Sequence, residues 1–218
     1  MNNKSLFFLV SLLLFVGCIH RNGISTEYYK SGQLKSAGKV KNGKQNGIVR
    51  TYYESGRLMT KSSFKNGKRV GEKLSFFENG VVKEREIYNR KGVLDGKYEK
   101  YFESGTLQYE AFYKSGLLER LAIEFYDNGD IYKMSQFKNG KLEGEQLAYH
   151  TNKVLALKAF SRKGKQHGEW VYFDLEGDTL KKEEFKNGYL MNSVMYQEIE
   201  SESLYKLGFV QLPSNLTP

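Results

Sequence analysis

The amino-acid sequence predicts an all-β protein, an elongated single-layer antiparallel meander of about seven tandem β-hairpins preceded by a signal peptide. Three observations lead to this prediction. A short motif of two aromatic residues, a tight turn and an aliphatic residue recurs at a nearly constant step. Asn-Gly and related turn dipeptides recur between its copies. The chain also has 22 glycines and only 2 prolines, which suits strands joined by tight turns. A fixed period of this kind indicates an array of small structural units.

The repeated motif is clearest at Tyr52–Leu58, which reads Tyr-Tyr-Glu-Ser-Gly-Arg-Leu. Along the whole array, the steps between first aromatics are 24, 24, 25, 24, 24 and 23 residues. The last copies depart from the pattern, because Lys153 replaces the turn glycine and a two-residue insertion is expected around Leu175-Glu176. Their return segments, Leu155 to Phe160 and Leu180 to Phe185, are one residue shorter, which predicts a bulge or an altered turn. The other copies begin at Tyr28, Phe76, Tyr101, Phe125, Tyr149 and Tyr172.

Each repeat is expected to contain two turns. The Ser-Gly or Asn-Gly of the motif forms the first turn, and a dipeptide such as Asn66-Gly67 forms the second. Asn-Gly between alternating apolar residues is a strong hairpin signal, because both central positions of the favoured turn need a positive φ. A further glycine restarts the strand in most copies, with Arg120 as the exception. The connections are too short for helical crossovers, so we expect about fourteen strands, all antiparallel.

The N-terminal segment predicts export and a lipid anchor. Residues 1–17 carry one charge, Lys4, and an apolar run that fits a signal-peptide core but is too short to cross a bilayer. This run ends in Gly17-Cys18, which resembles a bacterial lipobox, so Cys18 is the expected lipidation site. The alternative is an ordinary cleaved signal that leaves Cys18 as a free thiol. The expected location is the cell envelope, at the outer membrane if the source has two membranes.

The predicted organisation therefore has four parts. Residues 1–17 are the lipoprotein signal peptide and residues 18–26 a linker after the lipidated cysteine. Residues 27–192 form the repeat array. Residues 193–218 form a C-terminal cap or a tail, since the open edge of a sheet needs to be covered.

With the aromatic pair, the turn dipeptides and the stretch Phe-Lys-Asn-Gly-Lys-x-x-Gly, residues 27–192 resemble the MORN-repeat-variant family. The resemblance implies an elongated antiparallel sheet of hairpins that serves in scaffolding, near membranes or in partner binding, and it implies no catalytic motif. Bacterial members of the family include antitoxin components of toxin–antitoxin systems. An antitoxin or immunity-type protein that neutralises a toxin by direct binding is therefore an alternative function.

The residues themselves favour a non-catalytic binding scaffold for a protein or for anionic envelope material. The three histidines, His20, His150 and His167, share no spacing, and no nucleophile, metal-binding or phosphate-binding motif is recognised. We therefore expect no enzyme activity, no cofactor and no metal, and we interpret the scattered Glu and Lys residues as a solvated sheet face. An envelope glycan-acting enzyme is a third alternative. Despite a net charge of +9, no nucleic-acid partner is expected for an exported protein.

The meander predicts two long edges of opposite charge, with all first turns on one edge and all second turns on the other. Lys65, Lys68, Lys138 and Lys141 represent the basic edge as candidate binding residues for phospholipid headgroups or acidic glycan. Lysines beside turns could alternatively serve only to keep a long sheet soluble. The acidic edge contains Glu54, Glu78, Glu103, Asp127, Asp130, Asp174, Glu176 and Asp178, with Lys30, Arg57 and Lys153 among them. The basic edge contains Lys41, Lys44, Lys65, Lys68, Arg69, Arg90, Lys91, Lys114, Lys138, Lys141, Arg162, Lys163, Lys165 and Lys186.

Consecutive aromatics in a strand point to opposite faces, so each face of the sheet is expected to carry an aromatic ladder. Cross-strand aromatic pairs stabilise a sheet by roughly 0.2–1 kcal/mol each, so structure alone could explain both ladders. A single layer cannot bury both faces, however, and an open face could bind peptide, glycan or lipid. One ladder is Tyr52, Phe76, Tyr101, Phe125, Tyr149 and Tyr172, and the other contains His150, Phe173 and the candidate binding residues Tyr53, Phe77, Phe102 and Tyr126.

Overall fold

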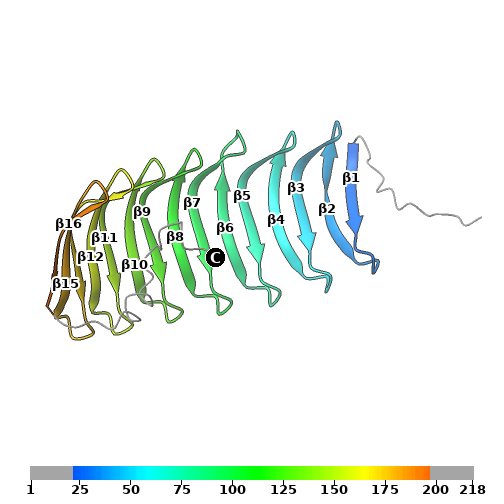
Figure 1. Cartoon of the computed structure of the whole chain (residues 1–218). Coiled ribbons are helices and arrows are strands. Elements are labelled where there is room, and N and C mark those ends of the chain that lie inside the picture. Colours follow the sequence, from blue (N-terminus) through cyan, green and yellow to red (C-terminus); the bar gives the residue numbers. More distant parts are fainter. Residues whose placement is uncertain (1–21, 197–218) are drawn as a thin grey trace, which may run out of the picture.

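The computed structural model describes residues 22–196, and this part of the chain forms one open antiparallel sheet (Figure 1). The strands follow one another in sequence order, except that the short β13 pairs with β12 beside β14. Their bounds are β1 Asn22–Tyr28, β2 Leu34–Lys41, β3 Lys44–Tyr52, β4 Leu58–Lys65, β5 Lys68–Phe76, β6 Val82–Tyr88, β7 Leu94–Tyr101, β8 Leu107–Lys114, β9 Leu117–Phe125, β10 Ile131–Lys138, β11 Lys141–Tyr149, β12 Leu155–Arg162, β13 Lys165–Gln166, β14 Gly168–Phe173, β15 Thr179–Lys186 and β16 Tyr189–Met195.

The predicted all-β meander of hairpins is confirmed, with small changes at its ends. β1 begins at Asn22, so the last residues of the expected linker belong to the array. β16 continues pairing with β15 as far as Met195, beyond the expected end at residue 192. β16, together with the split of β13 from β14, raises the count from the expected fourteen to sixteen. Residues 22–196 contain no helix, and hence none that is long and apolar enough to span a membrane.

All seven first turns have the same backbone hydrogen bonds. In the second copy, the amide of Tyr53 donates to the carbonyl of Arg57 at 2.8 Å, and that of Gly56 donates to Tyr53 at 2.9 Å. The sixth copy repeats this pattern although Lys153 replaces the glycine, because Lys153 adopts the same left-handed conformation with a φ of 70°. Its regular turn shows that a non-glycine residue can be forced into this geometry by the flanking strands.

The first hairpins of the last copies are regular, and the irregularities expected in them are wrong. Phe173 pairs with Thr179 as Tyr149 pairs with Leu155, so Phe173, not Tyr172, is the first aromatic of the seventh copy. The step from Tyr149 to Phe173 is then 24 residues, so the seventh copy contains no insertion.

The return strands of these copies are also of normal length. Ser161 pairs with Gly144 in the place that Phe64 takes opposite Gly47, so Phe160 lies one position earlier. A one-residue register shift precedes the first aromatic in every first hairpin, as between Thr51 and Tyr52, so the bulge is general and not special to the last copies.

The sheet is bowed (Figure 1). Most buried side chains lie on one of its two faces, which we call the inner face. The strand register connects one row of this face from β2 to β16, and the chemistry of the row changes along the array. Hydroxyl residues come first, charged residues and tyrosine follow, and apolar residues lie near the C-terminal end. The row is Ser36, Thr51, Thr60, Ser75, Glu84, Lys100, Tyr109, Glu124, Lys133, Ala148, Leu157, Tyr172, Lys181 and Met195.

The main hydrophobic cluster lies on the inner face of the last repeats. Its centre is Trp170, whose ring meets that of Phe185 edge to face at 5.6 Å. The indole nitrogen donates a hydrogen bond of 2.9 Å to the carbonyl of Phe160, so the polar atom of the buried ring is satisfied. Ala148, Leu157, Ala159 and Tyr172 complete the cluster.

Candidate binding surfaces

The second turns align along one long edge of the sheet and carry the predicted basic edge (Figure 1). Lys65 pairs with Lys68 across one such turn, and Lys138 pairs with Lys141 across another. All four side chains are exposed, and none has an ion-pair partner among residues 22–196. The structure thus places the four predicted lysines in two pairs on the same edge, with their charges open to solvent.

Contacts between turns hold these lysines in a row. Lys44 lies beside Gly67 of the next second turn, where an added Cβ would be 3.6 Å from the Lys44 Cβ. Lys141 has the same relation to Gly164, also at 3.6 Å. Equivalent positions lie two strands apart, which is about 10 Å at the usual strand spacing. Packing the apolar stems while the ammonium groups stay in water gives a regular line of positive charge.

Arg69 differs from the other members of the basic edge, and some second turns lack one of its lysines. The guanidinium of Arg69 lies 5.3 Å from the ring centres of both Phe64 and Tyr88 and therefore packs on the sheet. Val93, Leu117 and Tyr189 stand where the other second turns have a lysine, so the row is interrupted between Lys68 and Lys141 and at its C-terminal end. The positive charge that is open to solvent on this edge therefore comes mainly from the lysines.

The acidic edge is built differently, because its turns are joined by polar contacts. Ser31 donates to Glu54 at 2.5 Å, and Ser104 donates to Asp127 at 2.6 Å. Lys153 forms an ion pair of 2.9 Å with Asp130. Several carboxylates on this edge are therefore occupied by neighbouring repeats, whereas the four lysines opposite are not.

The predicted aromatic binding residues lie in the first turns, just beyond the strand ends, and all are half-buried. The Tyr53 hydroxyl donates to the carbonyl of Phe76 at 2.6 Å, and that of Tyr126 donates to Tyr149 at 2.7 Å. The same bond joins Tyr29 to Tyr52. Phe77 and Phe102 occupy the same turn position without a hydroxyl. Where the second aromatic is tyrosine, it therefore joins one repeat to the next, a role that sequence reasoning missed.

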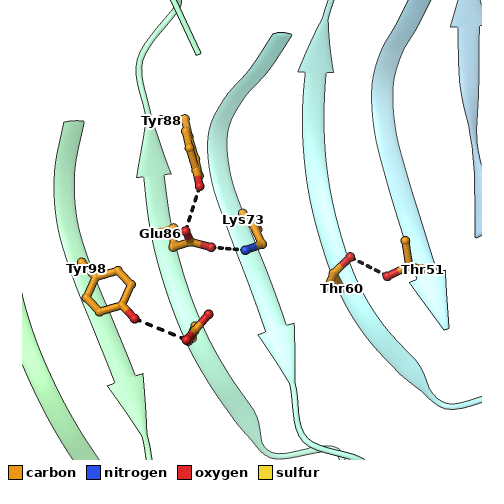
Figure 2. Close-up of polar contacts among 7 residues, drawn as sticks. Thr51, Thr60, Lys73, Glu86, Tyr88 and Tyr98 are labelled. Carbon is orange, nitrogen blue, oxygen red and sulfur yellow. Dashed lines mark hydrogen bonds and ion pairs between the residues drawn. The ribbon is translucent and has the colours of Figure 1, made fainter. Parts of the chain in front are cut away.

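The middle of the inner face carries a polar network that sequence reasoning also missed (Figure 2). Glu86 accepts a hydrogen bond of 2.8 Å from the Tyr88 hydroxyl and is paired with Lys73 on the neighbouring strand. The Tyr98 hydroxyl donates to Glu84 at 3.3 Å. The Tyr98 ring also lies 5.8 Å from that of Tyr109. The sequence predicts a solvated surface for such charges, but the side chains of Lys73 and Glu86 are only 18% and 12% exposed on the bowed sheet.

Enclosure also changes the titration of these tyrosines. Burial, together with nearby Tyr113 and Glu124, raises the pKa of Tyr109 to about 12. Burial and Glu84 raise the pKa of Tyr98 as well. Both phenols are therefore neutral hydrogen-bonding groups at physiological pH.

The opposite, outer face carries a line of ion pairs centred on Glu99, whose side chain is 11% exposed. Lys97 approaches Glu99 at 2.7 Å, and Arg85 approaches it at 3.4 Å. Burial by itself raises the pKa of this carboxyl. Hydrogen bonds from Lys97 and Tyr101 and the charge of Arg85 outweigh burial, so its pKa lies below the ordinary value of 4.5.

Replacement of Glu99 by Gln is expected to lower the free energy of unfolding at neutral pH by about 1–2 kcal/mol. A lowered folded-state pKa gives stability that is present above the unfolded-state pKa, near 4.5, and is lost as the pH falls through the folded value. Denaturant titrations from pH 7 to pH 3 should therefore show the two proteins converging on acidification. Glu110→Gln is the control, since Glu110 is 36% exposed and should contribute under about 0.5 kcal/mol.

The remaining sequence candidates are not brought together. His150 lies in a first turn, where its Nε2 is 3.0 Å from the carbonyl of Phe173, and His167 lies beside Asn187. Among residues 22–196, no group of three or more His, Cys, Asp or Glu side chains could hold a metal ion. Cys18 and His20 lie outside the described residues.

Comparison with known proteins agrees with the repeat architecture. The profile of the MORN repeat variant matches five segments, residues 21–42, 45–66, 69–90, 94–115 and 121–139. No curated protein matches the chain. Solved structures with similarity include the complex titled TcdB2-TccC3-Cdc42, at 13% identity and a TM-score of 0.22 over 78% of this chain. A porin-like protein from Bacteroides uniformis shows 11% identity and a TM-score of 0.19 over 79% of this chain and 96% of its own.

The chain spans only 12% of the length of the first of these structures. The family assignment depends instead on the repeats. Each matched segment covers a first hairpin of the sheet, with the aromatic pair, the first turn and the return strand. The chain belongs to the MORN repeat variant family.

Proposed function

We propose that this protein is a non-catalytic, lipid-anchored scaffold of the cell envelope that binds anionic envelope material along its basic edge. The observation that carries the proposal is the open row of lysines, in which Lys65, Lys68, Lys138 and Lys141 are exposed without ion-pair partners in residues 22–196. The acidic edge lies on the opposite side of the sheet, so its carboxylates are kept away from an anionic ligand bound at the basic edge. Such an arrangement orients the sheet as it approaches a negative surface.

The chemistry recognised is a dense array of phosphate or carboxylate groups, as on anionic phospholipid or on an acidic glycan. Each lysine near such a surface contributes about 1 kcal/mol. The row follows the array with an interruption at Val93 and Leu117, and sheets twist from strand to strand. A flexible polymer therefore follows more of the row than a flat membrane does.

Binding can be tested with a chain that begins at residue 18 and carries Cys18→Ala, so that no lipid contributes. We expect this chain to bind vesicles containing anionic lipid, or a soluble acidic glycan, and to release both as salt is raised. Comparing the vesicles with the glycan shows whether the protein binds phospholipid headgroups or an acidic polymer. Equal binding to neutral vesicles, or binding to neither ligand, would contradict the proposal.

The anchor is a separate prediction. Gly17-Cys18 at the end of an apolar leader supports acylation, and two acyl chains on one residue hold a protein stably at a membrane. Metabolic labelling with a palmitate analogue should tag the wild-type chain and leave Cys18→Ala untagged. Equal labelling of the two chains would show that Cys18 is not the anchor.

A further inference from the structure

β16 is the outermost strand at the C-terminal end of the sheet, and among residues 22–196 it pairs only with β15. Its outer edge has none of the features that protect edge strands, since Tyr189–Tyr196 contains no charged residue and no proline. Tyr189, Met191 and Tyr196 are 75%, 60% and 56% exposed. An uncharged strand with exposed apolar side chains is a template for pairing with another strand.

The chain continues for 23 residues after β16, nearly one repeat of 24. A step of 24 residues places residues 198–204, Glu-Ile-Glu-Ser-Glu-Ser-Leu, on residues 174–180, Asp-Leu-Glu-Gly-Asp-Thr-Leu. Each position keeps its chemistry, in the order acidic, aliphatic, glutamate, small, acidic, hydroxyl and leucine. Residues 174–180 form the last first turn and the start of β15.

The following residues continue the correspondence. The same step places Lys206 on Lys182 and Phe209 on Phe185. Phe185 closes the hydrophobic cluster beside Trp170 on the inner face. An aromatic residue occupies the equivalent position in most repeats, namely Phe64, Tyr88, Tyr113, Phe137 and Phe185.

We propose that residues 198–202 form an eighth first turn and residues 203–210 a strand that pairs antiparallel with the free edge of β16. The bounds follow from those of β15, Thr179–Lys186, advanced by one repeat. The five-residue connection is the one used by all seven first turns, so the partner strand is supplied within the chain at high effective concentration. This segment covers the apolar edge and ends the array, independently of what the basic edge binds.

Hydrogen exchange on the full chain tests the proposal. We expect the amides of residues 203–210 and of β16 to be protected together, at least about tenfold over residues 213–218, at every protein concentration. Protection of β16 that grows with protein concentration while residues 203–210 stay unprotected would show that a second copy covers the edge, and would overturn the proposal. Fast exchange in residues 203–210 under all conditions would also overturn it.

A pair of variants makes the test specific. Phe209→Asp places a charge on the inner face of the proposed strand and should accelerate exchange in residues 203–210 by about tenfold or more. Leu212→Asp introduces the same charge beyond the strand and should leave exchange there unchanged. Equal effects of the two substitutions, or no effect of Phe209→Asp, would contradict the pairing. In either variant, unchanged exchange in β2–β12 confirms that the array remains folded.

Discussion

Replacement of Trp170 by Ala is expected to lower the free energy of unfolding by about 3–5 kcal/mol, the largest stability effect that the structure predicts. The side chain is 6% exposed and packs against Leu157, Ala159 and Phe185 in the main hydrophobic cluster. Truncation leaves a cavity and also removes the donor to the carbonyl of Phe160. Because Trp170 is the only tryptophan, circular dichroism during denaturant titration is the suitable measurement.

Phe160→Ala is the matched control for this prediction. Phe160 lies in the adjacent strand β12 but is 40% exposed, so its truncation should cost under about 1 kcal/mol. Repeats contact only their neighbours, so Trp170→Ala should loosen the last repeats and leave β1–β8 protected in hydrogen exchange. Equal losses for the two substitutions would show that the cluster around Trp170 is not the centre of stability.

The second large effect is expected from neutralising the basic edge. Changing Lys65, Lys68, Lys138 and Lys141 together to Gln should weaken binding to anionic vesicles or acidic glycan at low salt by between about tenfold and a thousandfold. The upper limit assumes about 1 kcal/mol for each lysine at the charged surface. The difference between wild type and variant should shrink as salt is raised, because exposed charges are screened.

The control for this variant changes the net charge by the same amount at other places. Lys30, Lys61, Lys153 and Lys158 are exposed but lie outside the basic edge. Their combined change to Gln should reduce affinity far less than the change at the edge. Similar losses in both variants would mean that net charge alone attracts the ligand and that the row of lysines has no special role.

The sequence predicts the hairpin array and its charged edges because both depend on local signals. A turn dipeptide fixes where a hairpin reverses, and the alternation of turns assigns each lysine or glutamate to one edge. The error at the C-terminal end came from matching aromatic residues. Tyr172 resembles a first aromatic, yet the backbone pairing gives that place to Phe173, and the geometry of the first turn is kept even with Lys153 in the glycine position.

The inner face could not be predicted because alternation does not show which way a sheet bends. Glu84, Glu86 and Lys73 have the composition of a solvated surface, but the bend encloses them with tyrosines. The bonds from Tyr53 and Tyr126 were likewise missed, since a hydroxyl and a carbonyl 23 residues apart leave no local signal. The one sign of these hydrogen bonds in the sequence is that tyrosine recurs at this turn position.

The most direct test of the central claim is to locate the bound surface by lysine acetylation with and without the anionic ligand. We expect protection from acetylation to be confined to the basic edge, including Lys65, Lys68, Lys138 and Lys141. Lys61 and Lys158, within strands β4 and β12, should react equally in both states. Protection spread over all lysines, or confined to lysines outside the basic edge, would contradict the account.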